Sequence, residues 1–351
     1  MKRAFLLLLF VLVALYGKLA YDLRTEDTSP ANLPEGVLSD IAEKVTAIPL
    51  QAADGHRIEK PGSIRQEGRN LFLVSNGALY RFDLSGNFIG QVTRPGMEVA
   101  EYVIDPLRKR LIVFGNADEV AYYTFDGQLL ERKKLDGKTP RRRMQAVAMY
   151  RDCIWTAEER VCSDPLTNER YLEKQLVKYD SSFREMESHR LLAADLPEKS
   201  LVPFFGSLGI GVAEDSGMVY AYASPLLPDH LLRDSLRLKY RWDSGQVSAG
   251  DGFAAFPLRF GRRFWIASSC DPYDPSQNYT FCFDRDTNRS WQLNGGFEDD
   301  FYRTGAIARW QAMDVYSHAY CFYKSGEEVK HLFPQAASSG NPVVFIVKLK
   351  V

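Results

Sequence analysis

The fold is decided by the stretch Asn70–Val92, which reads NLFLVSNGALYRFDLSGNFIGQV. Its apolar runs and polar breaks predict three short strands separated by two tight turns. Gly77 and Gly86 stand in those turns, where a hairpin needs a positive φ angle. A sheet of three or four such strands cannot bury its own apolar face, so we expect it to stack on similar sheets. The expected strands are Leu71–Val74, Ala78–Leu84 and Phe88–Val92.

The same pattern returns about 40 residues later. Leu111–Phe114 repeats the first strand and Val120–Phe125 the second, and a turn at 126–128 leads into Leu129 and Leu130. Four looser copies follow. They are expected to open at Cys153–Thr156, Met218–Tyr222, Phe264–Ala267 and His318–Tyr323. Inside them, the polar residues 157–174 suggest a long hairpin loop, His230–Leu238 a short helix and Leu238–Trp242 a strand.

Six units of this period predict an all-β protein, a six-bladed β-propeller over residues 41–351. The aromatic content of 13% also suits strands more than helices. A propeller closes when one end of the chain completes a blade begun by the other, and Lys44–Leu50 and Val343–Leu349 are the natural partners. A β-sandwich joined to a second β domain is the alternative, and it would layer the strands in two slabs instead.

The N-terminus predicts export. Lys2 and Arg3 precede Ala4–Tyr16, an apolar run of 13 residues that is short for a bilayer span of about 20. Residues 1–21 are therefore interpreted as a signal peptide or a signal anchor, and 22–40 as a linker. Lys18 makes a poor signal-peptidase cleavage site, so both interpretations are kept. If the segment is an uncleaved anchor, residues 4–21 would contact the membrane. The body of the chain is expected in the periplasm or held at the membrane facing it.

Export makes the five cysteines candidates for disulfides. Cys153 and Cys162 flank a segment that could fold as a hairpin, and Cys270 and Cys282 flank a polar loop. Either pair could bridge neighbouring strands if the Cβ atoms face each other. Cys321 is left over. The alternative is five buried thiols, because free cysteine packs as a small apolar residue.

Motifs for known chemistry are absent from the sequence. The histidines form no zinc pattern, and no Gly-x-Ser-x-Gly elbow occurs. Asp284, Asp286 and Asn288 begin like a calcium loop, but Arg289 replaces the required glycine. We therefore interpret this stretch as a hairpin turn and predict no catalytic residue and no metal ligand.

The candidate ligand-binding residues fall in three places. Clustered carboxylates at Asp299 and Asp300 could bind a cation or a sugar, and the basic run Arg141, Arg142 and Arg143 could meet phosphate or an acidic glycan. Both clusters also have a simpler interpretation as hydrated loops. The third candidate is the pair Glu101 and Tyr102. The net charge of −1 gives no support for nucleic-acid binding.

Three segments resemble a known family, the NHL-like six-bladed β-propellers of the Bacteroidetes cell envelope. Phe82–Phe88 (FDLSGNF) resembles its blade hairpin, and Asn341–Lys350 (NPVVFIVKLK) its C-terminal strand. Gly96–Tyr102 (GMEVAEY) stands where that family has a Gly-Pro-rich turn ending in Glu-Tyr, although residues 98–100 depart from it. The resemblance implies the fold and a cell-envelope location, and it implies no reaction.

The expected function is that of an exported, non-enzymatic binding or scaffold protein without a cofactor. Its partner would be a small molecule, a glycan or an envelope protein, and not a nucleic acid. The alternative is an enzyme like the metal-dependent lactone hydrolase propellers, which hold calcium in the channel. Glu101, Asp215 and Asp299 would be the carboxylates to converge there. A third hypothesis is a pure protein-interaction platform.

Overall fold

The structure is a computed structural model, and all described residues belong to the unit formed by 35–351. The description covers residues 36–351 outside 52–56, 117–118, 135–141, 164, 168–169, 196–207, 214–215, 224–252, 255–257 and 271–277. No helix in the described part of the chain is long and apolar enough to cross a membrane. The expected helix and strand over 230–242, and the leader over 1–21, lie outside these residues.

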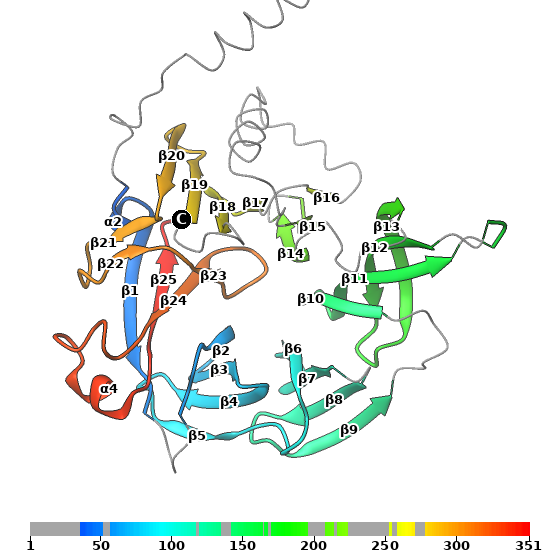
Figure 1. Ribbon diagram of the computed structural model, residues 1–351, viewed down its shortest axis with the longest axis horizontal. Coiled ribbons are helices and arrows are strands. Elements are labelled where there is room, and N and C mark those ends of the chain that lie inside the picture. The colour runs from blue at the N-terminus through cyan, green and yellow to red at the C-terminus, as the bar shows by residue number, and fades with distance from the viewer. Residues whose placement is uncertain are drawn as a thin grey trace, which may run out of the picture. The chain divides into compact units, whose positions relative to one another are not determined.

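The described strands form seven sheets, and the six larger ones follow one another in chain order (Figure 1). We call these sheets blades 1 to 6. Blade 1 contains β2 (Gly62–Glu67), β3 (Asn70–Ser75), β4 (Ala78–Asp83) and β5 (Phe88–Gln91). Blade 2 contains β6 (Val99–Asp105), β7 (Arg110–Gly115), β8 (Glu119–Thr124) and β9 (Leu129–Lys134). Blade 3 contains β10 (Arg142–Tyr150), β11 (Cys153–Ser163), β12 (Arg170–Tyr179) and β13 (Glu185–Asp195).

The second half of the chain continues the series. Blade 4 contains β14 (Leu208–Ala213), β15 (Met218–Ala223) and β16 (Phe253–Ala254). Blade 5 contains β17 (Leu258–Phe260), β18 (Phe264–Cys270), β19 (Asn278–Asp284) and β20 (Arg289–Asn294). Blade 6 contains β23 (Gln311–Ala312), β24 (Ala319–Lys324), β25 (Val343–Leu349) and β1 (Ala42–Pro49). Smaller elements flank them: α2 (Leu38–Ile41), the hairpin β21 (Phe297–Asp299) and β22 (Gly305–Ile307), and α4 (Pro334–Ser339).

Blade 6 joins the two ends of the described chain. β1 pairs antiparallel with β25, and Ala47 lies directly opposite Phe345 (Figure 1). Apolar side chains from both strands, including Val45 and Val347, lie in one buried cluster. The predicted closure is therefore confirmed, and the fold is an all-β, six-bladed β-propeller. The arrangement in two slabs is excluded because the described strands form seven separate sheets of two to four strands.

Neighbouring blades meet through buried apolar side chains and close backbone contacts. Phe72 of blade 1 packs in one cluster with Val113 of blade 2, and Phe114 of blade 2 packs with Val177 of blade 3. Gly86 has a φ of 87°, and a Cβ there would lie 2.0 Å from the carbonyl oxygen of Pro49 at the end of β1. The turn glycine of blade 1 thus lets its backbone press against blade 6.

The turn between the last two strands of a blade is capped by an aspartate in blades 1, 3 and 5. Asp83 and Asp180 each accept backbone N–H groups from two and four residues further on, at 2.8 to 2.9 Å. Asp284 accepts the backbone N–H of Asp286 at 3.0 Å. The segment that begins like a calcium loop is the turn between β19 and β20, so its interpretation as a hairpin turn is confirmed.

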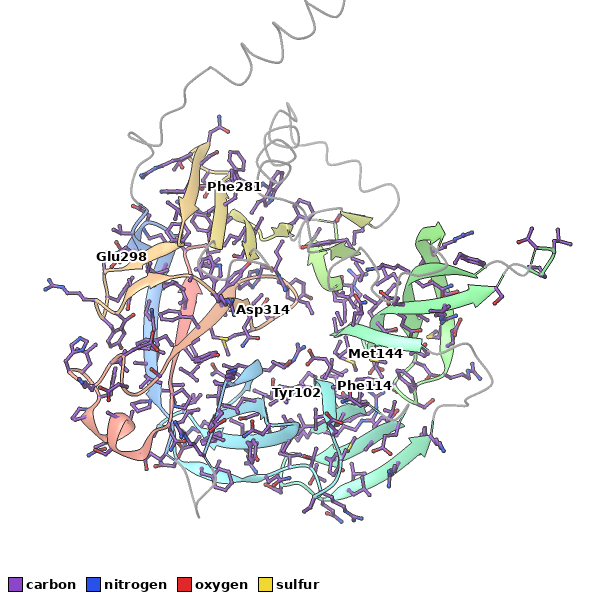
Figure 2. The ribbon with its side chains drawn as sticks, in the orientation of Figure 1. Tyr102, Phe114, Met144, Phe281, Glu298 and Asp314 are labelled. Atoms are coloured by element: carbon purple, nitrogen blue, oxygen red, sulfur yellow. The ribbon has the colours of Figure 1, made fainter. Side chains whose placement is uncertain are left out.

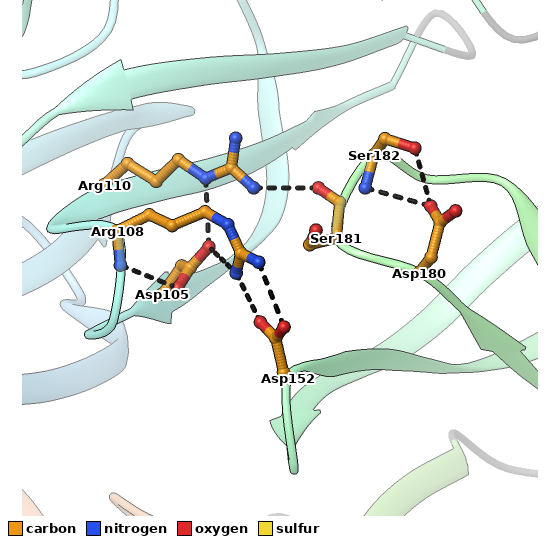
Figure 3. A network of polar contacts seen from close by, with 7 residues as sticks. All are labelled: Asp105, Arg108, Arg110, Asp152, Asp180, Ser181 and Ser182. Carbon is orange, nitrogen blue, oxygen red and sulfur yellow. Dashed lines mark hydrogen bonds and ion pairs between the residues drawn. The ribbon is translucent and has the colours of Figure 1, made fainter.

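Polar contacts also tie blade 2 to blade 3 (Figure 3). Asp105 is fully buried and accepts from Arg110 Nε at 3.0 Å and from the backbone N–H of Arg108 at 3.1 Å. Arg108 also pairs with Asp152 of blade 3, and Arg110 Nη2 donates to the carbonyl oxygen of Ser181 at 2.8 Å. One buried carboxylate therefore positions two arginines that reach the next blade.

The structure of blade 3 differs from two of the sequence-based predictions. Its strands β11 and β12 run through most of residues 157–174, so the expected long loop shrinks to residues between Ser163 and Arg170. Cys153 and Cys162 both lie on β11 and are free thiols. Nine residues of extended strand separate them by on the order of 30 Å, far beyond the reach of a disulfide. The first predicted bridge is therefore wrong.

The second predicted disulfide is contradicted by the strand register of blade 5. Cys282 is a free, buried thiol that lies opposite Ile266 in the ladder, whereas Cys270 lies opposite Asn278. The two cysteines thus stand at different levels of the same pair of strands, and they do not bridge. The reason is that β19 begins at Asn278, so Cys282 lies inside that strand and not at the end of the loop.

Candidate functional site: the central cavity

The first strands of the six blades line a common cavity of about 340 Å³. β2, β6, β10, β14, β17 and β23 all contribute to its wall. The wall mixes charge, amide and apolar side chains. The polar members are Ser63, Arg65, Glu101, Gln145, Arg259, Ser268, Gln311 and Asp314. The apolar and aromatic members include Ile64, Val147, Ile210, Ile266, Trp310 and Val315.

Three of these inner strands carry a β-bulge near their first residues. The pairing register shifts between Gly62 and Arg65 in β2, between Val99 and Glu101 in β6, and between Met144 and Ala146 in β10. A bulge adds one residue to a strand and changes the direction of the side chains beside it. The bulges in the three blades coincide with the cavity-lining residues Ser63, Glu101 and Gln145.

The main charged pair of the cavity joins blades 1 and 2. Arg65 Nη2 lies 3.5 Å from Glu101 Oε1, and both side chains are about one fifth exposed. Glu101 is held more closely by its other partners, the hydroxyl of Ser63 at 2.9 Å and the backbone N–H of Tyr102 at 3.0 Å. Glu101 is therefore fixed as an acceptor, while Arg65 is only loosely engaged.

The loop between β23 and β24 forms a partition in the channel. Its carbonyl oxygen at Val315 accepts the backbone N–H of Val212 of blade 4 at 2.9 Å, and Tyr316 packs edge-to-face on Tyr150 of blade 3. Arg259 of blade 5 donates to the carbonyl oxygen of Asp314 at 2.9 Å and to Ser317 Oγ at 2.8 Å. Figure 2 shows Asp314 at the inner margin of blade 6. The loop thus contacts three other blades.

A second cavity, also of about 340 Å³, lies at the other ends of β2, β6 and β10 and is completed by the β23–β24 loop. Its wall includes Glu67, Asp105, Tyr150 and Tyr316. Arg65, Asp314 and Val315 line both cavities. These three residues therefore mark the waist between the two cavities.

The side chains of the predicted pair, Glu101 and Tyr102, lie in two different environments. Glu101 faces the cavity, whereas Tyr102 is fully buried between blades 1 and 2 and donates its hydroxyl to the carbonyl oxygen of Phe72 at 2.9 Å. Burial raises the pKa of Tyr102 well above its usual value. Alternation along β6 explains the split, because successive side chains of a strand point to opposite faces.

The predicted acidic cluster lies away from both cavities. Asp299 is buried and accepts the backbone N–H groups of Phe301 and Tyr302 and the hydroxyl of Thr304 at 2.6 Å, so it caps the β21–β22 hairpin. Asp300 accepts the backbone N–H of Ser39 at 2.9 Å. Of the carboxylates named for a hydrolase, Glu101 lines the cavity and Asp299 does not, and Asp215 lies outside the described residues.

The predicted basic cluster, residues 141–143, overlaps the start of blade 3. Arg142 and Arg143 begin β10, while Arg141 and both arginine side chains lie outside the described positions. Among described residues, no three His, Cys, Asp or Glu side chains gather as a metal site requires. The sequence analysis missed Arg65, Arg259 and Gln311, because nothing in a β-strand pattern marks which polar residue faces a channel.

Comparison with known proteins supports the fold. Residues 28–188 match a family model described as a 6-bladed β-propeller. A solved structure from Bacteroides fragilis, provisionally named an exported protein, is similar over 90% of this chain and 97% of that chain, with 14% identity and a TM-score of 0.58. AztD of Citrobacter koseri matches 40% of this chain and 37% of its own at 17% identity and a TM-score of 0.27, too low to carry an argument. A search of curated proteins finds no match.

Proposed function

Since this chain is a six-bladed β-propeller, we propose that it is an exported binding protein that holds one small polar molecule in its central cavity. The observation that carries the proposal is the shared wall: all six blades contribute residues to one cavity of about 340 Å³. This volume suits a small ligand, and binding pockets typically combine apolar walls with a few fixed polar groups. The partition formed by the β23–β24 loop gives the ligand a floor.

Binding is favoured over catalysis by the state of the carboxylates in the wall. Both oxygens of Glu101 accept hydrogen bonds, and the carboxylate of Asp314 accepts the backbone N–H groups of Tyr316, His318 and Ala319. A general acid or base needs an oxygen that can exchange a proton with a substrate. These two carboxylates instead stabilise the wall and the floor.

Export is supported by two independent observations. The chain opens with two basic residues and an apolar run of 13 residues, the pattern of a secretory leader. The structural relative from Bacteroides fragilis carries a provisional description as an exported protein. We propose a periplasmic location or anchoring at the membrane facing the periplasm. Fusion of residues 1–40 to alkaline phosphatase tests it, and an inactive fusion would contradict export.

The binding proposal is tested with a channel-filling variant. Ala312 is half-buried in the cavity wall, so Ala312→Trp should occupy much of the space. The melting temperature is measured with a panel of sugars, organic acids, amino acids and nucleotides at millimolar concentration. We expect at least one compound to raise it in the wild type and not in Ala312→Trp.

The matched control is Gln335→Trp, which adds the same ring at an exposed position on α4. It should respond to the compound as the wild type does, and circular dichroism should confirm that both variants fold. If no compound stabilises the wild type, or if the Ala312 variant responds equally, the cavity is not the binding site.

A further inference from the structure

The position of Arg65 points to the chemistry of the ligand. Its side chain lies at the waist, where it lines both cavities, and it is about one fifth exposed. The guanidinium also lies over the ring of Tyr102, 5.5 Å from its centroid. A molecule entering either cavity would reach this group, so Arg65 is placed to contact whatever the channel holds.

The donors of Arg65 are poorly used within the described part of the chain. Nη2 makes two long contacts, 3.5 Å to Glu101 Oε1 and 3.5 Å to the carbonyl oxygen of Val147. Nε is buried without a hydrogen-bond partner. A buried donor left without a partner costs about 1–3 kcal/mol, and a guanidinium offers five donors in a planar fork. Arg65 therefore has donors that the described residues do not fill.

Arg110 shows what a fully engaged arginine looks like in the same molecule. Its Nε and Nη2 make bonds of 3.0 and 2.8 Å to Asp105 and to Ser181. Arg65 makes no contact of that length through its side chain among the described residues. The difference leaves donors of Arg65 for a group from outside the chain.

The charges of the wall select among anions. Arg65 and Arg259 are its cations and Glu101 and Asp314 its anions, so the described wall is balanced before a ligand enters. A single negative charge disturbs this balance less than the double charge of a phosphate monoester. Carboxylate geometry also matches the guanidinium fork through two parallel hydrogen bonds.

We propose that the cavity binds a small monocarboxylate, about the size of a sugar acid, whose carboxylate is bound by Arg65. This inference rests on the proposed binding function and names its ligand class. The carboxylate accepts from the terminal nitrogens of Arg65. The remainder of the ligand lies in the cavity at the first residues of the inner strands, against Gln311 and Trp310.

The test uses matched probes that differ in one group: glucuronate, glucose and glucose 6-phosphate, and a set of hydroxy acids with their amides. Binding to the wild type is measured by calorimetry. We expect a carboxylate to bind at least ten-fold more tightly than its neutral partner. Arg65→Gln should lose about ten- to 100-fold of that affinity, as expected for charge-assisted hydrogen bonds of about 1.5–3 kcal/mol.

Two further variants make the result specific. Glu101→Gln removes a negative charge beside the bound anion, so it should tighten carboxylate binding several-fold, which a merely structural role of the pair would not do. Arg132→Gln removes an exposed arginine paired with Glu119, outside both cavities, and should leave affinity unchanged.

The outcomes separate this inference from the binding function. Neutral compounds that bind in an Ala312-dependent manner, with no role for Arg65, would overturn the carboxylate and leave the binding function intact. Tighter binding of the phosphate would also overturn it. Failure of every carboxylate in the panel to bind the wild type would contradict the inference directly.

Discussion

Gly86 is the residue whose replacement should disturb the ring most at a single backbone position. An alanine there would adopt a φ of 87° and place its Cβ 2.0 Å from the carbonyl oxygen of Pro49. The left-handed conformation alone costs about 1–2 kcal/mol for an L-residue. We therefore predict that Gly86→Ala lowers the free energy of unfolding in urea by at least about 2 kcal/mol.

Gly90 provides the matched control in the same blade. A Cβ at this position would have no atom within 4 Å, and its φ is not positive. Gly90→Ala should change the unfolding free energy by less than about 1 kcal/mol. Equal effects of the two substitutions would contradict the close packing of blade 1 on blade 6.

The thiols also differ at the residue scale. Burial raises the pKa of Cys321 to about 12 and that of Cys282 well above its usual value, whereas Cys153 is half-buried. Because the thiolate is the reactive form, Cys282 and Cys321 should resist iodoacetamide at pH 8 in the native protein. Peptide mapping should show Cys153, Cys162, Cys282 and Cys321 fully alkylated in urea without reductant. A peptide linking Cys153 to Cys162 would contradict the structure of β11.

At the scale of elements, the blade 2 to blade 3 contact depends on Arg110. Its replacement by alanine would leave the fully buried Asp105 without one of its two arginines and remove the bond to Ser181. Breaking a buried ion pair from one side costs about 3–5 kcal/mol, and Arg108 retains part of it. Arg110→Ala should therefore lower the unfolding free energy by about 2–4 kcal/mol.

The control for Arg110 is the exposed pair of Lys348 and Glu43 in blade 6. Exposed ion pairs contribute about 0–1 kcal/mol, so Lys348→Ala should have little effect in the same urea titration. A loss below 1 kcal/mol for Arg110→Ala would show that Asp105 does not organise this contact.

The capped turns predict how stability depends on pH. Hydrogen bonds from the backbone of Arg184, and then from Ser182, lower the pKa of Asp180. In Asp83 burial acts in the opposite direction, but the hydrogen bonds from Asn87 and Ser85 lower its pKa overall. A lowered folded-state pKa contributes stability that is present above the unfolded value of about 3.9 and is lost as pH falls through the folded value.

We predict that Asp180→Asn is less stable than the wild type at pH 6 and that this difference shrinks as pH falls below about 4. Asparagine keeps an acceptor for the turn but carries no charge, so only the pH-dependent part is removed. Asp83→Asn should behave in the same way. Urea titrations at a series of pH values from 6 down to below 4 measure the difference in unfolding free energy between variant and wild type. A difference that stays constant with pH would contradict the role of these carboxylates.

The elements that the sequence identified well are those with strict alternation and glycine turns. Blade 1, blade 2 and the β1–β25 pair were predicted because their apolar residues and turn glycines are regular. Blade 3 was mispredicted because Glu158, Glu159 and Lys174 interrupt its apolar pattern. These side chains are nevertheless buried in β11 and β12, with Lys174 Nζ 3.6 Å from Glu159 Oε2. In the sequence alone, the polar residues of a buried ion pair cannot be distinguished from the polar residues of a loop.

The site was less predictable than the fold for a physical reason. Glu101 was found through a local resemblance, while Arg65 sits in a strand whose bulge decides which side chain faces the cavity. Asp299 looked like a ligand group and is a turn cap. Which carboxylate binds a ligand and which one holds the backbone depends on contacts between residues far apart in the chain.

At the scale of the whole molecule, closure depends on the ladder between β1 and β25. In β1, the N–H of Leu50 donates to the carbonyl oxygen of Pro342, whereas the N–H of Ala47 points away from β25 and donates to the hydroxyl of Tyr302. Because N–H groups alternate in direction along a strand, the N–H of Thr46 points toward β25, where Thr46 pairs with Ile346. Thr46→Pro removes that donor and should lower the unfolding free energy by about 1–3 kcal/mol. Thr46→Val, at the same exposed position, should be nearly neutral. Thermal unfolding followed by circular dichroism distinguishes them, and equal midpoints would show that blade 6 tolerates an open ladder.

The β1–β25 pairing also sets an order of events during synthesis. The earliest strand of the propeller leaves the ribosome almost 300 residues before the strand that completes it. Until then β1 has no partner strand, and the blades already formed make an open ring. A chain interrupted shortly before residue 343 would hold five complete blades and the strands β23 and β24 of the sixth, and still lack the strand that pairs with β1. Closure of the ring therefore waits for residues 343–349.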